Sequence, residues 1–151
     1  MIGLMRHSVR RALAWELLTV LAVVAVMMAV AIPYFGKTVV KAAVRSAADA
    51  IVALHARARA GGINRGRTAN LVLHANTAVV VATKVSGSGV DTLGKVVDLA
   101  GQYGVTVTST VDSIGFSPRG LGTNSSAVTI IISKSGFSDT LTVAKGGRLK
   151  R

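Results

Sequence analysis

The feature that most constrains this chain is an apolar run from Ala12 to Gly36, in which Glu16 is the only charged residue. A helix rises about 1.5 Å per residue, so this run would reach roughly 37 Å, longer than the ~30 Å hydrocarbon core of a bilayer. Backbone groups inside a bilayer have no water to bond, so the run is predicted to form a membrane-spanning helix. Residues 1–11 form a short basic leader, and the positive-inside rule places this end in the cytoplasm.

The composition predicts one small domain after this run, with a strong basic excess. The chain has 18 Lys and Arg against 6 Asp and Glu, a net charge of +12. Such a balance suits an anionic partner, such as nucleic acid, acidic lipid or an acidic protein face, or serves solubility alone. The absence of cysteine excludes disulfides, thiolate metal sites and a thiol nucleophile.

The helix is predicted to continue beyond Pro33 to Ala60. Apolar residues recur at steps of four and three and form one stripe, at positions 40, 44, 47, 51, 54 and 58. Arg45 and Asp49 are spaced to pair on another face, and Gly61 and Gly62 are expected to cap the helix. The expected segments are a leader (1–11), a transmembrane and assembly helix (12–36), its amphipathic continuation (37–62) and a β domain (63–151).

Residues 63–151 have sequence patterns typical of antiparallel strands. Alternating or β-branched segments are expected as strands at 68–74, 78–85, 105–111, 127–133 and 139–144. Hairpin turns are expected at 75–77 and around Ser135-Gly136. The predicted fold class is therefore α+β, with a long N-terminal helix whose apolar stripe is covered by an antiparallel β domain.

The sequence carries no pattern typical of catalysis. His7, His55 and His74 are too far apart for a metal signature, and phosphate-binding, dinucleotide-binding and hydrolase motifs are missing. Asp91 and Asp98 are spaced to share a calcium ion in the 86–104 loop, although solvated loop residues are the simpler interpretation. We expect no enzyme activity, no resident metal and no cofactor.

Three interpretations compete for the N-terminus. The simplest is a single-pass anchor. A second is a secretory signal peptide cut after Ala31, behind the small residues Ala29-Val30-Ala31, which would release a secreted β domain. Against this, Glu16 interrupts the apolar region, and the amphipathic stripe resumes directly after the supposed cut.

The third interpretation comes from a resemblance. The segment W-E-L-L-T-V-L-A-V-V-A-V-M-M-A-V-A-I-P is similar to the N-terminus of type IV prepilins and type II secretion pseudopilins, and the spacing of Glu16 and Pro33 matches. The resemblance implies cleavage between Arg11 and Ala12 by prepilin peptidase, followed by methylation, although the family usually has glycine and often phenylalanine there. It also implies that Glu16 pairs with the free α-amine of a neighbouring subunit. The alternative for Glu16 is compensation of the helix dipole.

The C-terminal half resembles the GspH/FimT group of minor pseudopilins and minor pilins. The resemblance rests on a phenylalanine-x-proline-x-glycine turn at Phe116–Gly120 and on the terminal pair Gly147-Arg148. It implies a β-sandwich-like domain and a structural subunit near the tip of a type IV pilus or type II secretion pseudopilus. It also implies an inner-membrane location with a periplasmic C-terminal domain. The partners implied are other pilins or pseudopilins and the inner-membrane assembly platform.

Basic residues at the end of the chain suggest a further partner. Some FimT-like minor pilins are implicated in DNA uptake through a glycine- and arginine-rich C-terminus, so the resemblance implies DNA as a candidate ligand. Its phosphates would meet Arg119, Lys145, Arg148, Lys150 and Arg151. Such binding would weaken steeply with salt. The alternative is a solvated tail.

Overall fold

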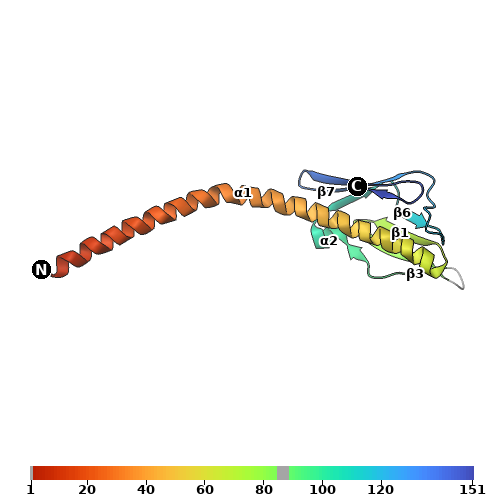
Figure 1. Cartoon of the computed structure of the whole chain (residues 1–151), viewed down its shortest axis with the longest axis horizontal. Coiled ribbons are helices and arrows are strands. Elements are labelled where there is room, and N and C mark those ends of the chain that lie inside the picture. Colours follow the sequence, from red (N-terminus) through yellow and green to blue (C-terminus); the bar gives the residue numbers. More distant parts are fainter. Residues whose placement is uncertain (1, 85–88) are drawn as a thin grey trace. The chain divides into compact units, whose positions relative to one another are not determined.

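The computed structural model describes the backbone of residues 2–84 and 89–151, and the side chains of residues 14–30, 35–84 and 89–151. A long helix, α1 (Ile2–Arg65), precedes the β-rich part of the chain, which also contains the short helix α2 (Leu99–Tyr103) (Figure 1). The strands are β1 (Ala69–His74), β2 (Thr77–Thr83), β3 (Val90–Thr92), β4 (Val97–Asp98), β5 (Thr106–Ser109), β6 (Ser113–Phe116), β7 (Val128–Lys134), β8 (Phe137–Val143) and β9 (Leu149–Lys150). The chain divides into two compact units, residues 1–39 and 40–151.

The predicted single helix is confirmed, but both of its predicted ends are wrong. α1 begins at Ile2 rather than Ala12 and ends at Arg65 rather than Ala60. The expected cap at Gly61-Gly62 is replaced by one at Gly66, whose φ is +60°. The amide of Gly66 donates to Ile63 and that of Arg67 to Gly62, over 3.2 and 3.1 Å, which is the bonding pattern of a Schellman cap.

Gly62 stays inside the helix because another segment lies against it. A Cβ at this position would come within 3.0 Å of the Ser117 carbonyl oxygen and 3.3 Å of the Arg67 carbonyl oxygen. The glycine therefore permits close approach of two backbones. A sequence pattern cannot separate this role of glycine from capping.

The strands form two antiparallel sheets, as the resemblance implied. One sheet has the order β3-β2-β1-β6, with β4 also paired to β2, and the other has the order β5-β7-β8-β9. The two predicted hairpins are confirmed. Their turn residues Ala75 and Asn76, and Ser135 and Gly136, all have positive φ, which suits two-residue hairpin turns.

Several short elements were not predicted from the sequence. These are β3, β4, α2, β6 and β9. Each strand among them is two to four residues long. Alternation over so few residues gives too little signal, and these strands depend on pairing with a longer neighbour.

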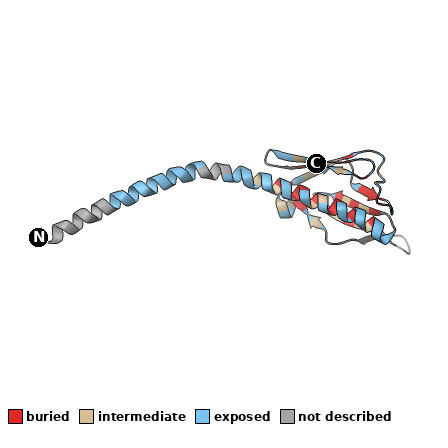
Figure 2. Cartoon of the chain, viewed as in Figure 1, coloured by how far each residue is buried: buried red, intermediate tan, exposed pale blue. Residues whose placement is uncertain are grey.

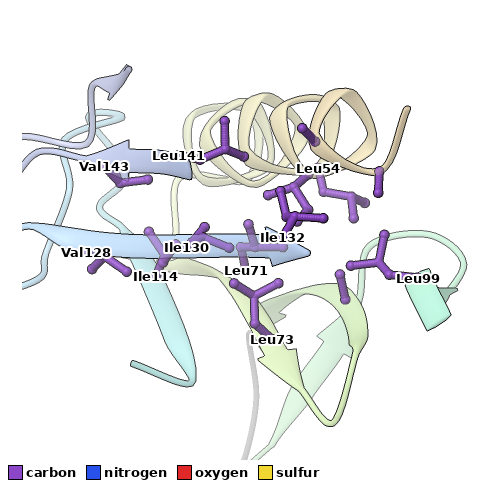
Figure 3. Packing of buried hydrophobic residues seen from close by; sticks show 14 of the residues in the cluster. Leu54, Leu71, Leu73, Leu99, Ile114, Val128, Ile130, Ile132, Leu141 and Val143 are labelled. Atoms are coloured by element: carbon purple, nitrogen blue, oxygen red, sulfur yellow. The ribbon is translucent and has the colours of Figure 1, made fainter. Parts of the chain in front are cut away.

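The second half of α1 and both sheets share one core. The predicted stripe is buried from Val44 onward, and Ile51 is fully buried. Figure 2 shows this buried face of α1 together with buried positions on the strands. Leu54 of α1, Leu71 of β1, and Ile132 and Leu141 of the second sheet belong to the same hydrophobic cluster (Figure 3).

Candidate assembly helix and basic cluster

The described side chains of α1 between residues 14 and 30 are mostly apolar and all exposed. Large side chains from Trp15 to Val30 are between 40% and 71% exposed. The helix portion from Ala14 has an 18-residue window of mean hydropathy 2.5, with none of that window buried, so it is long and apolar enough to cross a membrane. Glu16 is an exposed residue in this stretch, and its backbone carbonyl accepts a bond of 2.8 Å from the Thr19 hydroxyl.

The other residues expected at this end cannot be placed. Arg11, Ala12 and Pro33 lie outside the residues whose side chains the structure describes. Their expected roles in processing and assembly therefore stay predictions.

In the β domain, the loop from Phe116 to Gly122, between β6 and β7, is a compact turn. Phe116 is fully buried at the end of β6. The Ser117 amide donates to the Leu121 carbonyl over 2.8 Å, and the Gly120 amide donates back to Ser117 over 2.9 Å. Gly120 has a φ of +75°, so the turn needs glycine at this position. Arg119 is left exposed at the turn.

This loop packs against the turn that joins β8 to β9. The Gly122 amide donates to the Gly146 carbonyl over 3.1 Å. A Cβ on Gly122 would lie 2.5 Å from the Gly147 nitrogen and 2.7 Å from the Lys145 carbonyl oxygen. The two glycines therefore let the backbones touch. This contact brings the loop that carries Arg119 beside the turn that carries Lys145 and Arg148.

Arg59 of α1 joins the same surface. Its Nε lies 3.3 Å from the position that a Cβ would take on Gly120. We call Arg59, Arg119, Lys145 and Arg148 the basic cluster. In the part of the chain that the structure describes, no ion pair joins any of the four to a carboxylate. Arg59 could not be assigned to this surface from the sequence, since nothing in the sequence places the Phe116–Gly122 loop over α1.

His55 lies beneath this surface. It is 7% exposed, and its ring meets Phe116 edge-on at a centroid distance of 5.0 Å. Its Nε2 has no hydrogen-bond partner among the described residues. Burial lowers the pKa of His55 below its usual 6.5, and the charge of Arg59 lowers it further, against an opposing contribution from the Gly147 backbone. The imidazole is therefore kept neutral.

The tail is not a free solvated segment. β9 pairs with β8, the Ala144 amide donates to the Arg148 carbonyl over 2.8 Å, and Gly147 is buried. Lys150 is exposed on β9. The backbone of residues 145–150 is therefore ordered by pairing, whereas DNA contact by their side chains stays a prediction.

Arg151 has other partners than those expected. It binds Asp49 of α1 at 2.6 Å and Asp139 of β8 at 2.6 Å. The hydrogen bond to Asp139 raises the pKa of Arg151, with smaller contributions from the charges of both aspartates and from the hydrogen bond to Asp49. The predicted pair of Arg45 and Asp49 is wrong, because among the described residues the ion pair of Asp49 is with Arg151.

The aspartates of the 86–104 loop have structural roles. Asp98 caps α2 by accepting a bond of 2.8 Å from the Gly101 amide. Asp91 lies 3.9 Å from Arg65. Across the described residues, no group of three or more His, Asp or Glu side chains is arranged to hold a metal ion.

Comparison with known proteins matches this chain to one family. The model of the type II transport protein GspH matches residues 47–147, more than half of the chain. The chain belongs to the GspH family. No curated protein matches it.

The fold of this GspH-family chain is also found in solved structures. It is similar to the type IV minor pilin FimU of Pseudomonas aeruginosa strain PAO1 in two crystal forms. In the first form the TM-score is 0.59 at 19% identity, with 71% of this chain and 86% of that chain covered. In the second form it is 0.56 at 19% identity, with 70% and 90% covered. Family and fold are those of structural pilin subunits.

Proposed function

We propose that this GspH-family chain is a minor pilin or pseudopilin that sits near the tip of a type IV pilus or a type II secretion pseudopilus. The observation that carries the proposal is the exposed apolar half of α1 with a carboxylate at Glu16. An apolar helix of this kind is stable in lipid or against other helices, and a charge within it costs about 2.5–3.5 kcal/mol at a helix centre unless it is paired. Pairing between subunits would remove that cost.

In the proposed assembly, the chain is inserted with its N-terminus in the cytoplasm and its β domain in the periplasm. Prepilin peptidase cuts between Arg11 and Ala12 in the inner membrane, and the new α-amine is methylated. The assembly platform then moves the subunit into the filament, where Glu16 meets the Ala12 amine of a neighbour and Pro33 lies near the outer end of the apolar segment. Membership of the GspH family supports this route.

Glu16→Ala tests the assembly role. We expect the variant to reach the membrane at a normal level but to fall at least tenfold in sheared filament fractions, measured by quantitative immunoblotting. The matched control is Asp112→Ala, which removes an exposed carboxylate from the β domain. Unchanged incorporation of Glu16→Ala would reject the proposed pairing.

N-terminal sequencing of the protein from the producing cell tests the processing step. A chain that begins at Ala12 supports the pilin route. A chain that begins at Ile32 would identify a secreted domain released by signal peptidase, and would reject filament assembly through α1.

A second function, DNA capture, is favoured by the basic cluster. Arg59, Arg119, Lys145 and Arg148 come from three segments whose backbones lie close together, and none of the four has an ion-pair partner among the described residues. Several free cations brought together in this way can contact the phosphates of one DNA backbone. Lys150 is exposed nearby in sequence, whereas Arg151 has two carboxylate partners and would contribute less. This binding would be independent of base sequence, because only backbone charges are matched.

Mobility shift of duplex DNA by the full chain in detergent tests DNA capture. Arg119→Ala/Arg148→Ala should weaken binding and lower the slope of log K against log salt by about 2, at roughly 0.9 per phosphate contact. Lys84→Ala/Lys95→Ala removes the same charge from exposed positions elsewhere and should change neither quantity by as much. Equal effects of the two double variants would exclude a specific role for the basic cluster.

A further inference from the structure

The outer edge of β8 is open over part of its length. β7 pairs with β8 along the whole strand, whereas β9 pairs only with Thr142 and Val143. Between Phe137 and Leu141, no strand among the described residues pairs with this edge. An open edge offers backbone N–H and C=O groups with which an added strand can pair.

The direction of the backbone groups on this edge can be assigned. The Ala144 amide points toward the β9 side, since it donates to the Arg148 carbonyl over 2.8 Å. Outward-pointing groups alternate along an antiparallel strand, so the amide of Thr140 points the same way. That amide donates to the Oδ1 of Asp139 over 2.9 Å rather than to another strand. A side chain therefore occupies the place of a strand partner.

A groove lies beside this edge, entirely within the second unit. Its cavity volume is about 520 Å³. One wall comes from α1 with Lys41, Val44, Arg45 and Asp49, and the other from Phe137, Ser138, Asp139 and Arg151. Phe137, the first residue of β8, is 37% exposed and gives the groove an aromatic surface.

The unpaired charge of the groove is positive. Arg151 forms ion pairs with both aspartates, Asp49 and Asp139. Lys41 and Arg45 have no ion pair with a carboxylate in the described ranges. An occupant with acidic side chains would therefore complement the groove.

We propose that the groove binds an extended acidic segment of a neighbouring subunit, which adds as a strand to the open edge of β8. A backbone carbonyl of the segment replaces Asp139 as acceptor for the Thr140 amide. A carboxylate of the segment takes a place beside Lys41 and Arg45 and competes with Asp139 for Arg151. Main-chain bonds supply affinity and the charges supply selectivity, as in other cases of strand addition. The source of the segment rests on the proposed filament role.

Fluorescence anisotropy with the full chain in detergent micelles tests the groove. The probe is a labelled seven-residue peptide that alternates threonine or valine with glutamate. We expect Lys41→Ala/Arg45→Ala to weaken binding about five- to tenfold, because two charge contacts are lost. The matched control, Lys84→Ala/Lys95→Ala, removes two exposed charges outside the groove and should stay within about twofold.

Two further measurements separate strand addition from simple charge attraction. A peptide with proline at its centre should not bind, because it lacks an amide donor and cannot join the ladder. Asp139→Ala should tighten binding of the parent peptide several-fold, because it uncovers the Thr140 amide and removes one of the two carboxylates that pair with Arg151. Bound peptide should slow hydrogen exchange at that amide. Equal losses in both double variants, or undiminished binding of the proline peptide, would overturn the proposal. Thermal denaturation checks that each variant is folded.

The peptide-binding results do not depend on filament assembly. If Glu16→Ala leaves incorporation intact while the peptide binds as expected, the assembly hypothesis fails and the groove stands. If the peptide does not bind while Glu16→Ala blocks incorporation, the groove is rejected alone.

Discussion

His55 is a buried side chain that contacts the core through Phe116 and is affected by the charge of Arg59 at the surface. It is held between Phe116 and the segment that carries Gly147, and the cation of Arg59 lies close enough to disfavour a second positive charge. Protonation would place a charge where burial leaves its Nε2 without a partner. The neutral ring is therefore part of the support for the basic cluster.

This environment predicts a pH dependence. In the unfolded chain His55 titrates near its usual pKa of 6.5, whereas in the folded chain its pKa is lower. As pH falls below about 6.5, the unfolded state binds the proton first, so stability declines from there toward the folded pKa, by at most about 1.4 kcal/mol per pH unit. Above pH 6.5 the residue makes no pH-dependent contribution.

Thermal melts of the full chain in detergent between pH 7.5 and 5 check this prediction. The wild-type midpoint should fall more than that of His55→Leu, whose side chain cannot take up a proton. Parallel curves for the two proteins would show that His55 does not titrate differently on folding.

At the scale of elements, the contact between the Phe116–Gly122 loop and the β8–β9 turn holds two separate segments together. It rests on close approach of the backbones of Gly122 and Gly147. Close-packed interiors do not accept an added methyl group without movement. The position of the basic cluster therefore depends on these glycines.

Gly122→Ala should destabilise the domain by about 1–3 kcal/mol, because its Cβ would overlap the backbone of Gly147 and Lys145. DNA retardation should weaken as well, because Arg119 would move away from Arg148. Gly146→Ala is the matched control, because a Cβ there meets nothing within 4 Å. Urea denaturation compares the two variants, and similar losses in both would contradict this explanation.

The long elements of this fold could be predicted from sequence, whereas the arrangement of its short ones could not. The stripe through Ile51 and Leu54 and the β7–β8 hairpin have periodic signals over many residues. The helix end was misplaced because Gly62 serves a tertiary contact that no local pattern shows. For the same reason, nothing in the sequence placed Arg59 beside the Phe116–Gly122 loop, or Arg151 beside Asp49 and Asp139. The surroundings of both arginines depend on contacts between segments that are far apart in the sequence.

At the scale of the whole molecule, the hydrophobic core lies in one unit. All described buried core residues fall between Val44 and Val143, within the unit of residues 40–151. The described side chains of residues 14–30 contribute nothing to it. Folding of the β domain should therefore be independent of the apolar segment.

A fragment that begins at Val40 should be soluble without detergent and should unfold cooperatively. Circular dichroism, size-exclusion chromatography and thermal denaturation check this expectation, with the full chain in detergent as reference. A midpoint within a few degrees of the reference would confirm it. An aggregated fragment, or one that melts without a transition, would show that the domain needs the residues before Val40.

The apolar stretch from Leu17 to Val30 presents hydrophobic side chains in all directions around its axis. An apolar stripe on only one face of the helix would allow it to pack against one neighbour in one orientation. With no preferred side, a helix that follows the proposed route from bilayer to filament could exchange lipid for protein neighbours at any rotation about its axis. In such a filament, polar residues such as Glu16 would fix the rotation of each helix about its axis, since the apolar surface favours no particular rotation.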